Sequence, residues 1–218
     1  MLLNKVATLS LLVLLFFLYS CASPQFSKID ISMPKDFEMI NTEIKDKIPL
    51  RAGLYLKPDI RNYSKKGPIA SFVTHTTFSM GDALSSGSER VLRNIFKDVV
   101  IIDQLESDLS TKNIDVIVTP ELVGIYGQAK MIDGSKVPKA VNQLVMKWNI
   151  VSPDGKIIYV NTITGEGLQK LSFSFTSAGI AEDEKNNMLM LIKDQFQKAQ
   201  EDIYSSGWWK KQWWKNSN

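Results

Sequence analysis

The sequence has only one cysteine, Cys21, and one histidine, His75, among its 218 residues. A single cysteine forms no disulfide within the chain, so the stability of the fold depends on its apolar core. A zinc site needs three or four ligands, and a Ser-His-Asp triad needs a base that a third group orients. We therefore interpret His75 as a residue at the end of a strand and predict no metal site and no catalytic residue.

Neither positive nor negative charge dominates the sequence. The chain carries 26 Lys and Arg against 23 Asp and Glu, a formal net charge of +3, whereas nucleic-acid binding favours a strongly basic face. Glu121 and Glu166 lie near the ends of predicted strands, and Glu182–Glu184 begin a predicted helix, so no two carboxylates are singled out as a general acid–base pair. The glycines and serines of 81–88 lack the lysine of a phosphate loop. We predict a protein that is not an enzyme.

The N-terminus has the order of a secretory signal peptide. Lys5 lies in the first part, a continuous apolar run follows from Leu11 to Tyr19, and the small residue Ser20 precedes Cys21. The apolar run is too short to cross a hydrocarbon core of ~30 Å as a helix. The alternative is an uncleaved N-terminal anchor in which Cys21 is incidental. We favour the signal peptide because its three regions follow one another in the expected order.

The four residues Leu18-Tyr19-Ser20-Cys21 resemble the lipobox of bacterial lipoproteins, with an aliphatic residue three positions before the cysteine and a small residue directly before it. Tyr19 is bulkier than the residue usual at its position. The resemblance implies a diacylglyceryl group on the Cys21 thiol and an acyl chain such as palmitate on its amine, with no other cofactor. Two or more acyl chains give stable anchoring. Ala22, which is not Asp, implies the outer membrane of a two-membrane host, with the protein in the periplasm.

Composition divides the chain into four parts: a signal peptide over 1–20, a lipidated tether over 21–48, one domain over 49–206 and a Trp/Lys-rich tail over 207–218. The tether contains two prolines and has no sustained periodicity, which is typical of a spacer between anchor and domain. We expect an irregular lead-in there, with Phe26 and Phe37 docking on the domain.

Within the domain, apolar periodicity predicts six strands and two helices. The strands are expected over 50–56, 69–74, 99–102, 116–125, 141–151 and 156–165, and the helices over 79–96 and 181–204. Ser79 with Asp82 resembles a capping box at the start of the first helix, and residues 59–67 and 126–139 are expected to be loops. Residues 152–155 predict the turn of an antiparallel hairpin. This order indicates an α+β fold in which a mostly antiparallel sheet carries both helices on one face.

The C-terminal tail concentrates aromatic and basic residues. It contains Trp208, Trp209, Lys210, Lys211, Trp213, Trp214 and Lys215. Tryptophan favours membrane interfaces, lysine is attracted to anionic head groups, and exposed tryptophans also anchor protein interfaces. The tail could instead fold back onto its own domain. We expect it to contact a membrane or a partner, because a cluster of exposed aromatic side chains usually marks an interaction site.

The order of elements resembles the small periplasmic α/β domains of envelope-complex lipoproteins, such as accessory lipoproteins of lipopolysaccharide export and of ABC-type lipid or substrate transport. That resemblance implies a non-enzymatic outer-membrane lipoprotein that binds and supports a larger assembly through an envelope protein partner. One alternative is a carrier or sensor for an apolar, envelope-derived ligand held between sheet and helices. A third is a hydrolase of envelope polymers.

Overall fold

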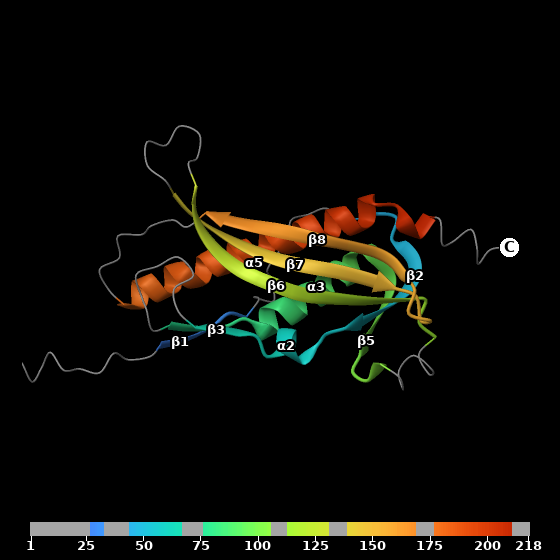
Figure 1. The fold of residues 1–218 in the computed structure, drawn as a ribbon, viewed down its shortest axis with the longest axis horizontal. Helices are drawn as coiled ribbons and strands as arrows, with labels where there is room; N and C mark the ends of the chain where they lie inside the picture. Colours follow the sequence, from blue (N-terminus) through green and yellow to red (C-terminus); the bar gives the residue numbers. More distant parts are fainter. Residues whose placement is uncertain are drawn as a thin grey trace, which may run out of the picture.

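The computed structural model describes residues 27–32, 44–66, 76–105, 113–130, 139–168 and 177–210 (Figure 1). Their elements follow the order β1 (Ser27–Asp30), β2 (Ile48–Tyr55), α2 (Pro58–Arg61), β3 (Ser64–Lys66), β4 (Thr76–Ser79), α3 (Gly81–Ile95), β5 (Phe96–Ile102), β6 (Val116–Lys130), β7 (Lys139–Val151), β8 (Ile157–Leu168) and α5 (Ser177–Ser205). The predicted strand over 69–74 lies outside the described residues, as do Phe26 and Phe37.

Five strands form the main sheet, in the order β5-β2-β6-β7-β8. β6, β7 and β8 form an antiparallel meander, and the β7–β8 hairpin confirms the predicted one. Its turn uses Gly155 at φ +83°, a conformation that glycine adopts without steric cost. The α+β class is confirmed and the longest ladders are antiparallel, but β2 pairs in parallel with both β5 and β6. This parallel part was not predicted, because parallel pairing joins strands that are far apart in the sequence.

Both long helices, α3 and α5, lie on one face of the main sheet, as expected (Figure 1). On β7, four alternating residues are buried on the side of these helices: Leu144, Met146, Trp148 and Ile150. The ring of Trp148 meets that of Phe196 edge-on at 6.2 Å. β8 approaches α5 so closely that a Cβ added to Gly165 would lie 2.6 Å from the Cα of Gln195.

A smaller sheet, β1-β4-β3, includes segments that were predicted to be irregular or loop. β1 lies in the expected irregular lead-in, and α2 and β3 lie in the expected polar loop over 59–67. β1 pairs in parallel with β4, and their side chains Ile29 and Phe78 are buried. A strand of three or four residues is too short to show a clear alternation of apolar and polar residues. Its formation therefore depends on its pairing partner more than on its own sequence.

Several boundaries also differ from the predictions. Ser79 pairs within the small sheet instead of capping α3, whose N-cap is Met80 without a side-chain hydrogen bond. β6 ends at Lys130 and β7 begins at Lys139, so residues 126–130 and 139 of the loop expected over 126–139 are strand. Helix α5 begins at Ser177, before the expected position 181. The extension of β6 and β7 follows from their pairing with each other, which the local sequence does not show.

Candidate functional site

The lipobox residues Leu18, Tyr19, Ser20 and Cys21 lie outside the described residues, and so does His75. The first described strand begins at Ser27, so residues 22–26 separate Cys21 from β1. Five or six residues span at most about 20 Å when fully extended. An anchor at Cys21 would therefore hold the β1 end of the fold close to the lipid.

Of the tail residues, Trp208 is buried at 8% exposure. Its ring packs against Phe96 with centroids 6.3 Å apart. Gly207, at φ +65°, turns the chain after α5 and allows residues 208–210 to form one further helical turn. Trp208 therefore belongs to the core of this domain, because the end of α5 brings it beside the first residue of β5. The membrane or partner contact expected for Trp208 would have required an exposed ring.

The next two tail residues remain at the surface. The half-buried ring of Trp209 stacks on Tyr204 with centroids 6.0 Å apart and planes 29° apart. Its Nε1–H donates to the backbone oxygen of Tyr204 at 3.4 Å, and the Nζ of the exposed Lys210 lies 5.4 Å from its centroid. This arrangement holds an indole in place under a cation. Lys211, Trp213, Trp214 and Lys215 lie outside the described residues.

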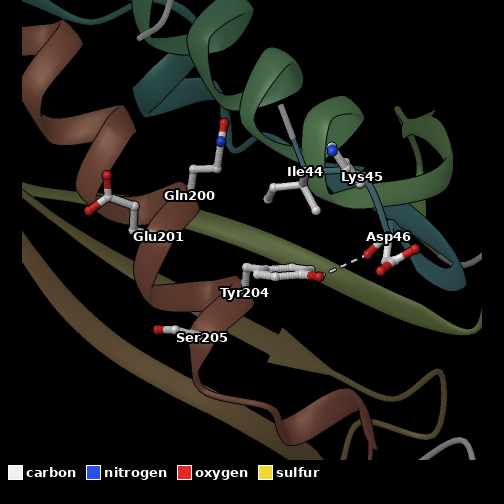
Figure 2. A pocket seen from close by; sticks show the side chains of 7 residues that line it. All are labelled: Ile44, Lys45, Asp46, Gln200, Glu201, Tyr204 and Ser205. Carbon is white, nitrogen blue, oxygen red and sulfur yellow. Dashed lines mark hydrogen bonds between the residues drawn. The ribbon is translucent and has the colours of Figure 1, made fainter. Parts of the chain in front are cut away.

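A pocket of about 410 Å³ lies beside this aromatic stack, between the last turns of α5 and the segment that leads into β2. Figure 2 shows the Tyr204 ring reaching from α5 toward that segment, where its hydroxyl donates to the backbone oxygen of Asp46 at 3.0 Å. Ile44 and the Tyr204 ring give the pocket apolar surface, and Asp46 and Glu201 supply carboxylates at its rim. No local pattern in the sequence predicts this pocket, because residues 44–46 and 200–205 are brought together only by the fold.

The two carboxylates near strand ends do not converge. Glu121 accepts a hydrogen bond from Lys57, which holds the pKa of Glu121 below its usual range. Glu166 accepts one from Gln143 Nε2 at 2.8 Å. Their partners on β7, Lys147 and Gln143, are four residues apart, a distance of about 13 Å along a strand. These carboxylates therefore cannot act on one substrate atom as an acid–base pair.

Strand β8 forms one edge of the main sheet, and α5 covers part of that edge. Asp194 Oδ2 accepts a hydrogen bond from the Glu166 N–H at 2.7 Å, and Lys198 Nζ donates to Thr164 O at 3.4 Å. The stretch from Ile157 to Val160 lies beyond these contacts, and the two residues are 67% and 42% exposed. The predicted hairpin located this strand, but its position at the edge depends on the order of the whole sheet.

Among the residues described, no helix is both long and apolar enough to span a bilayer. The same residues contain no group of three or more His, Cys, Asp and Glu that could hold a metal ion.

No protein-family model and no curated protein matches the chain. Solved structures with a similar arrangement include a minor lipoprotein from Acinetobacter baumannii, with 12% identity over 74% of this chain and 95% of the other, at a TM-score of 0.43. A hypothetical protein from Chlamydia trachomatis has 8% identity over 75% and 98%, at 0.43. Lipoprotein GNA1162 from Neisseria meningitidis has 10% identity over 64% and 98%, at 0.34. Because all three TM-scores are below 0.5, we base the function on this chain's own residues.

Proposed function

We propose that this protein is a lipid-anchored lipoprotein of the bacterial outer membrane that acts as a non-enzymatic accessory subunit, binding a protein of an envelope or transport assembly. The observation that carries the proposal is the sequence Leu18-Tyr19-Ser20-Cys21 at the end of the apolar run. Acylation at Cys21 supplies a membrane anchor independently of any spanning helix.

The open stretch of β8 supports the protein-binding part of the proposal. By the two-residue alternation of a strand, Val160 directs its backbone N–H and C=O groups outward as Thr164 does. The backbone groups of β8 that side chains of α5 bond are those of Thr164 and Glu166, whereas the contact at Tyr159 is made through its side chain. An exposed edge accepts an extended segment as an additional strand, and its side chains select the segment. The occupant we propose is an extended, apolar segment of the partner, packing on Ile157 and Val160.

Metabolic labelling with a palmitate analogue tests the anchor: the native chain should be labelled and Cys21→Ser should not.

Site-specific photo-crosslinking from position 157 tests the partner. It should give one discrete adduct, which Val160→Lys abolishes, whereas a crosslinker at Met190, which is 51% exposed on α5, should give none. Labelling without an adduct would retain the anchor and exclude the β8 edge as the binding site.

A second candidate is the carrier or sensor of an apolar ligand, which the pocket beside Tyr204 favours. That pocket lies at the surface, whereas the cleft expected from the sequence lies between sheet and helices. Native mass spectrometry of the detergent-purified protein separates the two functions: a bound lipid lost on Ile44→Lys supports the carrier, and a ligand-free mass supports the accessory subunit.

A further inference from the structure

Three charged side chains of α5 form a row that faces strand β8. Asp194, Lys198 and Asp202, the α5 row, are spaced by four residues and therefore share one side of the helix. Asp194 Oδ2 accepts the Glu166 N–H at 2.7 Å, and Lys198 Nζ donates to the backbone oxygen of Thr164 at 3.4 Å. Lys198 Nζ also lies 2.7 Å from Asp194 Oδ2. This ion pair occupies backbone groups that an additional strand would use.

The third member of the row reaches the edge through an intermediate residue. Asp202 Oδ2 accepts a hydrogen bond from Asn161 Nδ2 at 2.9 Å. Asn161 Oδ1 in turn accepts the backbone N–H of Thr162 at 2.8 Å. The α5 row therefore follows the edge of β8 backwards, from Glu166 through Thr164 to Thr162.

The spacings of helix and strand explain why the row fits the edge. Four residues of an α-helix advance by about 6 Å, and two residues of a strand by about 6.6 Å. Each step of four residues along α5 thus meets the next outward-facing residue of β8. The following step would place Ser206 opposite Val160, but α5 ends at Ser205, and the Ser206 hydroxyl donates to the backbone oxygen of Ile203 at 2.7 Å. The edge is consequently open at Val160, where the helix stops.

We propose that the α5 row is a specificity-determining stop of the β8 docking site. Asp194 and Lys198, together with Asn161 held by Asp202, end an added strand before Thr162 and turn the rest of the partner away from the sheet. The inference rests on the proposed function, because it takes the β8 edge as the place where the partner binds.

The stretch before the stop indicates which segment fits. Residues 157–161 carry no charge, and the side chains of Ile157 and Val160 are exposed. A neutral, extended segment can pair there without leaving a charge unpaired, and its side chains select it. A strand that continued past Asn161 would have to displace hydrogen bonds to charged groups, and those groups would lose their partners.

The test maps where the added strand ends, in cells that express the full chain with a photo-crosslinker at position 157 or at position 166. The native chain should give an adduct from 157 and none from 166. Asp194→Ala with Lys198→Ala frees the outward backbone groups of the later edge. An adduct of the same mass should then appear from 166, increased by roughly tenfold or more because hydrogen bonds to charged groups no longer compete. The adduct from 157 should persist, which shows that the variant is folded.

The matched control is Glu89→Ala with Arg93→Ala, which removes an ion pair of the same spacing from α3 and should leave position 166 without an adduct. An adduct from 166 in the native chain, or none in Asp194→Ala with Lys198→Ala, would overturn the stop and retain the β8 site. No adduct from 157 in the native chain would instead overturn the β8 site itself. An adduct of twice the chain's mass would replace the partner by a second copy.

Amide hydrogen exchange gives a readout that needs no partner. In the purified full mature chain carrying Cys21→Ser, the Glu166 amide should exchange slowly, because Asp194 accepts its hydrogen. Adding Asp194→Ala and Lys198→Ala should speed this exchange by roughly tenfold or more, whereas the Val160 amide should exchange rapidly in both proteins. Unchanged exchange at Glu166 would show that the ion pair does not close the edge.

Discussion

At the scale of single residues, Gly87 allows α3 to pack against the ring of Phe196. A Cβ at Gly87 would lie 2.0 Å from Cε2 of that buried ring. Gly87→Ala should therefore destabilise the protein by about 1–3 kcal/mol through overpacking, although alanine favours a helix over glycine by about 1 kcal/mol. Urea denaturation measures the change, with Ser85→Ala on the same helix as the control. A Gly87→Ala protein as stable as the native one would show that the helices separate easily.

The adjacent residues Trp208 and Trp209 provide a second test at this scale. Trp208→Ala leaves a cavity beside Phe96 and should cost about 3–5 kcal/mol of unfolding free energy. Trp209 is half-buried, and its replacement removes one stacked pair on Tyr204, worth about 0.5–1.5 kcal/mol beyond the area it buries. Thermal unfolding of the two variants should rank them in that order. The reverse order would place Trp209 in the core and leave Trp208 available for binding.

At the scale of elements, α5 is joined to β8 by polar contacts at Asp202, whose carboxylate accepts hydrogen bonds from Tyr159 and from Asn161 Nδ2, the latter at 2.9 Å. Burial, with the hydrogen bond to Asp202, raises the pKa of Tyr159 above its usual value. The neutral phenol is thus favoured in the folded state. Its contribution to stability is complete below the unfolded pKa of about 10 and is lost as the pH rises through the folded one.

Tyr159→Phe should therefore lower the unfolding free energy by about 1–2 kcal/mol at neutral pH, because a hydrogen bond to a charged group is lost. It should also reduce the fall in stability between pH 9 and pH 11, measured by urea denaturation at each pH. Tyr55→Phe, on a different strand, should leave that fall in place. If the stability of the native and Tyr159→Phe proteins fell identically at alkaline pH, the ionisation of Tyr159 would not be its cause.

The elements that the sequence predicted well are those with a long periodic pattern. The β7–β8 hairpin combines alternating burial from Leu144 to Ile150 with a turn that requires Gly155, and α3 has buried residues at helical spacing. The small sheet was missed because β1, β3 and β4 are short, and β1 pairs with β4 from a distant part of the chain. The parallel neighbours of β2 were missed because they lie far from β2 in the sequence.

At the scale of the whole molecule, the candidate site is only partly accessible to sequence reasoning. The motif ending at Cys21 depends on consecutive residues and can be recognised locally. The open edge at Ile157 and Val160 and the pocket at Tyr204 arise where separate elements meet. The tail shows both cases: its composition marked an interacting segment, but only the position of Phe96 beside the end of α5 shows that Trp208 is a core residue.

The relative strength of the proposed lipid anchor and of the expected lysine contact of the tail gives a prediction for the whole chain. Each buried CH₂ of an acyl chain contributes about 0.8 kcal/mol, so two or more chains hold a protein stably. Three lysines near an anionic surface contribute about 3 kcal/mol together, an interaction that salt screens. Cys21→Ser should therefore move the protein from the membrane fraction to the soluble fraction of a cell lysate, whereas replacing Lys210 and Lys211 by Ala should not.

At low salt, part of the Cys21→Ser protein should remain with the membranes, and this part should disappear at 0.5 M salt because a charge-based contact is screened within about one Debye length. Immunoblotting of fractions at both salt concentrations measures the distribution, and Cys21→Ser combined with the two lysine changes serves as the soluble reference. A Cys21→Ser protein that stays with the membranes at high salt would show that an uncleaved apolar N-terminus, and not acylation, is the anchor.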